Sequence, residues 1–447
     1  MRLLGIVLLG SIGLALPSDA QERLAITSTT VIDGRTGQAK SGHTIVVEGQ
    51  RIVAVGPHDS VSVPPGTRII DGRGKWVTPG FVDVHAHSTP PAVLRRALAL
   101  GVTTIHMMPS VPAPPDTFHS LEVSSNAPTS RTPRVVITSP LFTGRFPGNV
   151  LPRAVNFATP KDVAEVQEKL SELNRTGFKS IKVIQDDGRL WTSPEAIVPR
   201  LPDDVFRELV GGAHRLGMRV YGHVTQLTDT RQAIAAGVDV FVHGTMDSVL
   251  VDSLWTRMRD RRIVWAAAFR IVAAGADPSA YARRVLTDAV LRESLSATES
   301  TAFVADTMGT ARPPDMPFPG LRPNGRDYIR VIRENTRRAR THGLTIAVGS
   351  DAGISGNGPG IGTHLEMELL QEAGLTPAQV VVAATFGGAV AIGVQDGIGT
   401  IERGKLADMV ILSRNPLLDI RNARAIEWVV KGGTPIRRDE LVSGGRN

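Results

Sequence analysis

The sequence contains no cysteine, and aromatic residues make up only 4% of its 447 residues. The absence of cysteine excludes disulfide bonds, thiolate catalysis and cysteine-ligated metal sites. The scarcity of aromatic rings argues against stacking surfaces for single-stranded nucleic acid. The net charge is +7, with no run of five or more basic residues, so we expect no nucleic-acid partner. Hydrophobic residues reach 42% and charged residues 21%, which predicts a folded chain with a large core.

Long apolar runs are also scarce, and the one at the N-terminus is short. Arg2 precedes an apolar stretch over residues 3–16, and the segment ends in small residues at Ala20. This pattern is typical of a secretory signal peptide covering residues 1–20. The apolar stretch is shorter than the ~20 residues that span a bilayer. We therefore expect an exported protein, periplasmic or secreted, with no membrane span after cleavage.

The two ends of the chain differ in pattern from its middle. Residues 21–78 and 396–447 contain short β-like segments and turn signals, which predicts a composite β-sandwich built from both termini. Residues 79–395 alternate apolar runs with helical patterns, which predicts an α/β fold, a parallel (β/α)8 TIM barrel. The eight strand candidates are residues 81–87, 102–108, 134–139, 180–185, 218–223, 238–243, 263–269 and 345–350.

Two connections in this predicted barrel are unusually long. Residues 109–132 are rich in proline and serine with little periodicity, so we expect a long loop there. Residues 270–325 form an insertion after the seventh strand, where connections normally have ~2–6 residues. An insertion at this place would lie over the carboxyl face of the barrel. We expect a lid or substrate wall, with a decorative or homo-oligomer-forming segment as the alternative.

The ionisable residues gather at the carboxyl ends of the predicted strands. His85 and His87 end the first strand, and their spacing of two places both imidazoles on one face. The carboxyl ends of parallel barrel strands surround one opening, so side chains from different strands should meet there. The set of predicted metal ligands is His85, His87, Lys182, His223, His243 and Asp351.

Lys182 is the unusual member of this set, because it lies in an Ile- and Val-rich strand. Burial there would lower its pKa and yield a neutral amine, which can add carbon dioxide to form a carbamate. The two oxygens of a carbamate can bridge two cations; the alternative is a lysine that serves as a salt-bridge partner. Nitrogen and oxygen ligands without sulfur suit Zn²⁺, with Mn²⁺, Co²⁺ or Fe²⁺ as alternatives. The predicted first ion has the ligands His85, His87 and Asp351, and the second has His223 and His243.

These motifs resemble those of the amidohydrolase superfamily, and specifically its imidazolonepropionase-like, prolidase-related branch with a binuclear metal centre and a carbamylated lysine. The resemblance covers residues 24–433, nearly the whole chain after the leader. Relatives with dipeptidase activity often carry a tyrosine where this chain has Thr225, and many carry Arg-Asp in place of His106-Met107. The motifs that carry the resemblance are residues 77–87, 180–182, 222–225, 235–245, 348–353, 373–377, 399–410 and 415–416.

This resemblance implies a metal-dependent enzyme that cleaves an amide bond, peptide-like or N-acyl, with a hydroxide that bridges two divalent ions. Asp351 would be both a ligand and the group that carries a proton from that water to the leaving amine. The substrate would be a small molecule or a short peptide-like compound. The alternatives are an ester or lactone hydrolase, a cyclic amidohydrolase or a deaminase on the same site, and a non-catalytic periplasmic binding protein.

Substrate contacts are harder to predict than metal ligands, because each candidate could equally pack in the core. Asp186, Asp187 and Arg189 follow the fourth strand and could bind a charged substrate group or form a solvated loop. The four predicted substrate contacts are Tyr221, Thr225, His106 and His364.

Overall fold

The computed structural model describes residues 22–87, 90–108, 115–144, 157–191, 199–307, 321–353 and 358–443. The predicted signal peptide, residues 1–20, lies outside these described residues, and export stays a prediction. Within the described ranges, no helix combines the length and the apolar character that a bilayer crossing requires.

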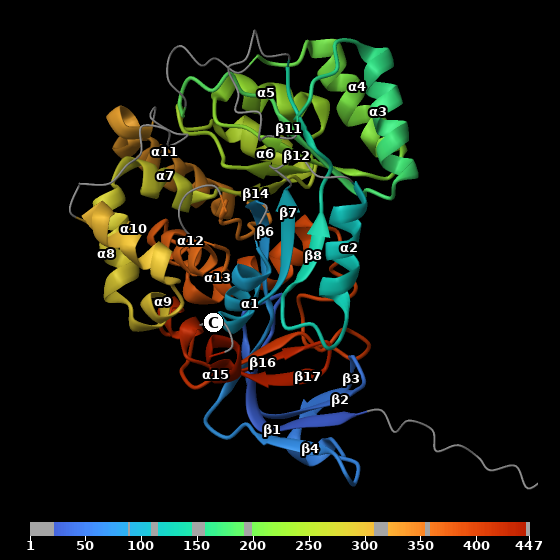
Figure 1. The fold of residues 1–447 in the computed structure, drawn as a ribbon, viewed down its shortest axis with the longest axis vertical. Helices are drawn as coiled ribbons and strands as arrows, with labels where there is room; N and C mark the ends of the chain where they lie inside the picture. The colour runs from blue at the N-terminus through green and yellow to red at the C-terminus, as the bar shows by residue number, and fades with distance from the viewer. Residues whose placement is uncertain are drawn as a thin grey trace, which may run out of the picture.

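The central part of the chain alternates parallel strands with helices, in the order that the apolar pattern predicts (Figure 1). The strands are β6 (Phe81–His87), β7 (Val102–Met108), β8 (Arg134–Ile137), β9 (Leu141–Phe142), β10 (Phe157–Ala158), β11 (Ser180–Ile184), β12 (Arg219–His223), β13 (Val240–Val242) and β14 (Val264–Ala266). The helices that flank them are α1 (Pro91–Ala99), α2 (Pro115–Asn126), α3 (Val163–Arg175), α4 (Asp203–Arg215), α5 (Leu227–Ala236), α6 (Asp252–Asp260), α11 (Leu321–Thr341) and α12 (Ile361–Glu372).

Backbone hydrogen bonds close these strands into a ring. β8 pairs with β7, and β9, four residues further on, pairs with β11. Residues 345–352 fill the last gap: Ala347 N donates to Trp265 O at 3.0 Å in β14, and Val84 N in β6 donates to Val348 O at 2.9 Å. The fold is therefore the predicted (β/α)8 barrel.

The eighth strand is less regular than its sequence predicts. Residues 345–352 make two isolated bridges instead of a continuous ladder, Ile346 with Trp265 and Ala352 with Ala86, and the chain turns sharply at Asp351, whose φ is +52°. The predicted strand at residues 263–269 is also shorter, since Ala268 has a φ of +48° and Phe269 already begins helix α7.

Both ends of the chain contribute to one further sheet, seen as blue and red strands in Figure 1. β5 pairs with the early strand β1 on one side and with the late strand β15 on the other. The sheet encloses a core drawn from both termini, as the composite β domain requires. Its strands are β1 (Arg23–Ile32), β2 (Ala39–Glu48), β3 (Arg51–Pro57), β4 (Arg68–Asp71), β5 (Trp76–Pro79), β15 (Met409–Leu412), β16 (Ile426–Lys431) and β17 (Thr434–Arg437).

The loop predicted over residues 109–132 is wrong, because helix α2 occupies residues 115–126. Its periodicity is weak, and packing stabilises it instead: Phe118 is buried, and the Ser125 hydroxyl accepts a hydrogen bond from Val135 N in β8. The ammonium of Lys431 in β16 donates to Ser125 O at 2.6 Å and so satisfies the end of the helix. Residues 109–114 lie outside the described part of the chain.

The insertion over residues 270–325 is mostly helical where it is described. These helices share a core with α12 and with Leu100, the residue after α1, through Tyr281, Leu291, Phe303 and Leu365 among others. Residues 308–320 lie outside the described ranges, so the role of a lid stays a prediction. The insertion helices are α7 (Phe269–Ala276), α8 (Pro278–Thr287), α9 (Ala289–Glu293) and α10 (Ala297–Thr307). The remaining helices are α13 (Pro377–Val382), α14 (Gly388–Ala391) and α15 (Arg438–Ser443).

Candidate metal centre

Three of the predicted ligands meet around the carboxylate of Asp351. Its Oδ1 lies 2.8 Å from His87 Nε2 and 3.3 Å from His85 Nε2. Its Oδ2 lies 3.9 Å from Nδ1 of His243. His85, His243 and Asp351 are all buried, and one ligand atom from each lies within 4.8 Å of those of the other two. This spacing fits the shared coordination of a metal ion.

Lys182 and His223 complete the cluster on the side of β11 and β12. Lys182 Nζ lies 3.5 Å from His85 Nε2, deep in the barrel. The rings of His223 and His243 are 4.2 Å apart between centroids. The structure thus brings all six predicted ligands together at the carboxyl ends of the strands, and their coordination of metal stays a prediction.

The backbone turns sharply at two of these residues. His243 has a φ of +77° and Asp351 a φ of +52°. A left-handed conformation in a non-glycine residue costs of order 1–3 kcal/mol and persists only when its surroundings enforce it. His243 directly follows β13, and Asp351 directly precedes Ala352, which bridges to Ala86 in β6, so both turns lie beside strand positions of the barrel.

Burial sets the protonation of the cluster. It lowers the pKa of His223 to about 3, with the charge of Lys182 adding to the effect. Burial also lowers the pKa of His85 and His243 well below the usual range. Burial brings the pKa of Lys182 to about 7, although the Asp351 carboxylate opposes this change. Neutral imidazoles and a neutral amine offer lone pairs, which metal coordination and carbamate formation require.

The residues present fit a divalent metal centre. Two buried atoms of the cluster, His85 Nδ1 and His223 Nε2, have no hydrogen-bond partner among the described residues. Buried polar atoms are normally satisfied by hydrogen bonds, and unsatisfied ones require an explanation such as an ion. Nitrogen and oxygen donors without sulfur, grouped this closely, are the donor set of Zn²⁺ and similar ions.

The buried carboxylate of Asp83 connects the segments around Asp351, which we call the Asp351 side of the cluster. Asp83 Oδ1 accepts hydrogen bonds from His85 N at 3.2 Å and Ser350 N at 3.0 Å, and its Oδ2 accepts one from Thr363 Oγ1 at 2.7 Å. Asp83 thereby joins β6, the Asp351 segment and α12. Asp83 is not among the residues expected from the sequence. Its signal is the alternation of residues 83, 85 and 87, which places all three side chains on one face of the strand.

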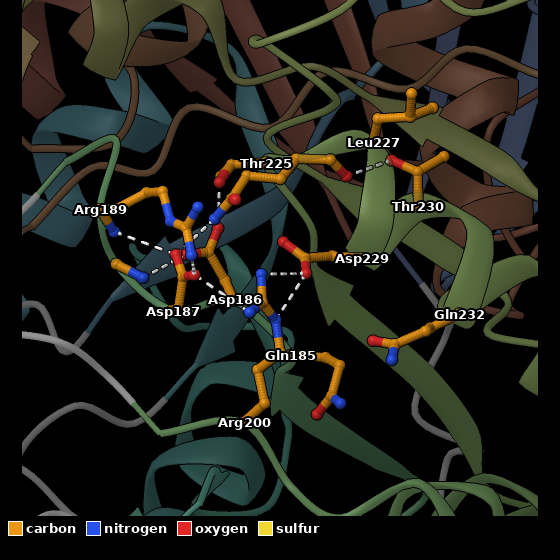
Figure 2. A network of polar contacts seen from close by, with 12 residues as sticks. Gln185, Asp186, Asp187, Arg189, Arg200, Thr225, Leu227, Asp229, Thr230 and Gln232 are labelled. Atoms are coloured by element: carbon orange, nitrogen blue, oxygen red, sulfur yellow. Dashed lines mark hydrogen bonds and ion pairs between the residues drawn. The ribbon is translucent and has the colours of Figure 1, made fainter.

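A second polar network supports the His223 side (Figure 2). Asp186 Oδ2 lies 3.6 Å from His223 Nε2, and the same carboxylate accepts hydrogen bonds from the Thr225 hydroxyl and from Trp191 Nε1. Figure 2 shows the side chains of Asp186 and Thr225 turned toward each other. Asp186 is fully buried, so it belongs to neither a solvated loop nor an open surface. Thr225 is therefore connected to His223 through the carboxylate of Asp186.

Three predicted substrate contacts already use their polar atoms within the protein. Tyr221 Oη donates to Ala391 O at 2.7 Å, and His364 Nε2 lies 2.8 Å from Leu100 O. The ring nitrogens of His106 lie 3.2 Å from Val84 O and 3.2 Å from Ser180 Oγ. All three side chains are buried, which favours the packing alternative for them, and a role in substrate binding stays a prediction.

A (β/α)8 barrel that gathers four histidines, a lysine and an aspartate at its mouth defines a metal-dependent hydrolase. The profile of the Amidohydrolase family matches residues 76–436, and the chain belongs to that family. It is therefore a metal-binding enzyme that hydrolyses carbon–nitrogen bonds of amide or cyclic amide type.

Full-length relatives agree with this assignment. The imidazolonepropionase of Symbiobacterium thermophilum is 25% identical over 405 residues, which cover 83% of this chain and 84% of that protein. The crystal structure of a prolidase candidate from Bifidobacterium longum has a TM-score of 0.73 at 24% identity, covering 96% of this chain and 100% of that one. A Xaa-Pro dipeptidase with bound methionine has a TM-score of 0.71 at 21% identity, covering 93% and 100%. The two structures support the fold.

Proposed function

We propose that this protein is an exported binuclear amidohydrolase that cleaves an amide bond, peptide-like or N-acyl, in a small-molecule or short peptide-like substrate. The observation that carries the proposal is the position of Lys182. Its amine is buried, lies 3.5 Å from His85, and has a pKa of about 7. A lysine with these properties is suited to carry a carbamate between two groups of ligands.

We assign the six side chains to two ions in the division expected from the sequence. His85, His87 and Asp351 would hold one ion, and His223 and His243 the other, with carbamylated Lys182 shared between them. We favour Zn²⁺ because the donors are nitrogen and oxygen only. When bound, two divalent ions lower the pKa of a water molecule and polarise a substrate carbonyl.

The chain's own residues supply the proton transfer. The Oδ1 atom of Asp351 lies close to both His85 and His87, and its Oδ2 atom lies 3.9 Å from His243 Nδ1. A carboxylate there can accept the proton that the attacking water releases and pass it to the leaving amine nitrogen. The neutral histidines do not compete for that proton, because burial holds the pKa of His223 and its neighbours low.

A cyclic amide is the second candidate substrate. Its support is the similarity to the imidazolonepropionase of Symbiobacterium thermophilum, which extends over 84% of that protein. Export rests on the leader pattern of residues 1–20.

The test is turnover of a panel of dipeptides, N-acyl amino acids, cyclic amides and esters by the purified protein, with elemental analysis of the same samples. We expect about two ions per chain and hydrolysis of at least one open-chain amide. Lys182→Ala should lose activity and recover part of it with short carboxylic acids. A metal content near one, or activity confined to esters, would contradict the proposal.

A further inference from the structure

One arginine reaches the Asp351 segment from the insertion. Arg270, the second residue of α7, is completely buried. Its guanidinium donates from Nε to Ser350 O and from Nη2 to Asp351 O at 2.7 Å. A single side chain thus binds two successive backbone carbonyls, and one of them belongs to the residue that the proposed function assigns to proton transfer.

These two contacts depend on the backbone conformation of Asp351. In an extended strand, successive carbonyls point to opposite sides, so one guanidinium cannot bind both. The positive φ of Asp351 turns its peptide away from the strand direction. Both carbonyls reach Arg270 in the left-handed conformation that Asp351 adopts, which without support would be unfavourable by of order 1–3 kcal/mol.

The other side of the same residue is held as well. Asp351 N donates to His85 O at 2.7 Å, so β6 fixes the peptide before Asp351 while Arg270 fixes the peptide after it. With both peptides fixed, the carboxylate of Asp351 faces the histidines.

Arg270 is itself anchored by its surroundings. Its backbone N donates to Glu366 Oε2 in α12 at 2.8 Å, and its Nη1 contacts the Tyr281 hydroxyl in α8 at 3.4 Å. The Arg270 side chain also passes close to Gly362, where an added Cβ would lie 3.1 Å from Arg270 Cδ and 3.1 Å from Ser350 Cβ. The insertion and α12 therefore determine together where the guanidinium lies.

We propose that Arg270 is a positioning residue that selects the left-handed conformation of Asp351 and so aligns its carboxylate for proton transfer and metal binding. The role of the carboxylate rests on the proposed function, while the backbone clamp rests on the contacts alone. The first turn of the insertion is on this view part of the support of the metal centre, whatever the rest of the insertion does.

The test compares Arg270→Ala and Arg270→Lys with Arg424→Ala. Arg424 is also buried, and its guanidinium pairs with Asp288 and Glu368 rather than with the Asp351 segment, which makes Arg424→Ala the matched control for loss of a buried guanidinium. For Arg270→Ala we expect kcat to fall by roughly 10²-fold, the size expected for a misplacement of about 1 Å, with KM changed less. Guanidinium ion added at millimolar concentration should restore part of kcat, whereas urea should not.

Arg270→Lys keeps the charge but cannot bond both carbonyls with a planar fork, so it should fold, show a lower kcat and gain nothing from guanidinium. A second readout does not need turnover: Arg270→Ala should release metal to a chelator faster than the wild-type protein, whereas Arg424→Ala should release it at the wild-type rate.

Wild-type kcat and metal release in Arg270→Ala would overturn the proposal. A loss of activity that merely follows the unfolded fraction, with no rescue by guanidinium, would assign Arg270 a structural role and overturn it too. If the wild-type protein hydrolyses no amide, the proposed function fails, and the comparison of metal release decides the backbone clamp separately.

Discussion

The two sides of the metal centre are supported by similar chemistry but by very different connections. On the His223 side, Asp186 joins Thr225 and Trp191, so all partners come from residues 186–225, in and after two neighbouring strands. On the Asp351 side, Asp83 contacts a residue 267 positions away in the sequence, and Arg270 contacts residues 80 and 81 positions away. The contacts of the His223 side therefore join residues that are close in the sequence. Those of the Asp351 side form only after distant parts of the chain have packed together.

This difference predicts which properties a substitution on each side should change. A change on the His223 side should affect one ion and leave the remainder of the site in place. A change in the residues that support Asp351, namely Asp83 and Arg270, should affect metal binding, proton transfer and the stability of the barrel together, because one network serves all three. The experiments below test that contrast, beginning with the largest expected effect.

Asp351→Asn should separate coordination from proton transfer. An amide oxygen can still face the ion, but it cannot accept a proton, so kcat should fall by roughly 10²–10⁴-fold while most of the metal is retained. His87→Asn is the comparison variant and should lose metal and activity together. Stopped assays and elemental analysis measure the two quantities, and near-normal kcat in Asp351→Asn would move the search for the base to other residues.

Asp186→Asn should weaken the His223 side alone. Removing a carboxylate behind a ligating histidine typically costs about 10–100-fold in metal affinity. We expect one of two ions to be lost more readily on dialysis against a chelator, while the other remains. The Asp187→Asn variant is the neighbouring control, since Asp187 pairs with Arg200 and Arg189 rather than with His223. Equal loss of both ions would show that the two sides are not independent.

Glu366→Gln should change how stability depends on pH on the Asp351 side. Burial, reinforced by the charge of Asp83, raises the pKa of Glu366 to about 8, although Arg270 opposes the shift. Because folding raises this pKa, the folded protein binds the Glu366 proton more tightly than the unfolded chain does. The resulting contribution to the free energy of unfolding is fully present below the pKa of Glu366 in the unfolded chain, and it is lost as the pH rises toward 8. The wild-type free energy of unfolding should therefore fall relative to Glu366→Gln by up to about 1.4 kcal/mol per pH unit in that window. Urea titrations at several pH values measure the difference, and parallel curves would contradict it.

The sequence predicts which ionisable side chains lie close together, because their placement follows from local rules. A spacing of two on a strand and a position at a strand end are enough to bring His85 and His87 together with His223. Arg270, Glu366 and the role of Asp83 could not be predicted, because their partners come from segments whose packing no local pattern specifies. The turn at Asp351 has the same origin, since Arg270 and β6 fix it from both sides.

The same reasoning explains the two differences in secondary structure. Helix α2 has weak periodicity of its own and depends on Lys431, which lies in a strand near the opposite end of the chain. The eighth strand loses its regularity where it must turn its last residues over the opening. Both features are decided by tertiary contacts that outweigh local preference.

The sheet built from both termini has a consequence for the order in which the molecule can assemble. β5 follows β1 closely in the chain, yet its other edge stays open until β15 arrives, some three hundred residues later. Contacts of such separation are slow to form, and an unpaired strand edge is prone to join the wrong partner in the meantime. The barrel is therefore fully synthesised before the open edge of β5 is paired. We expect the newly made chain to be protected from aggregation at this edge only once β15 has been made.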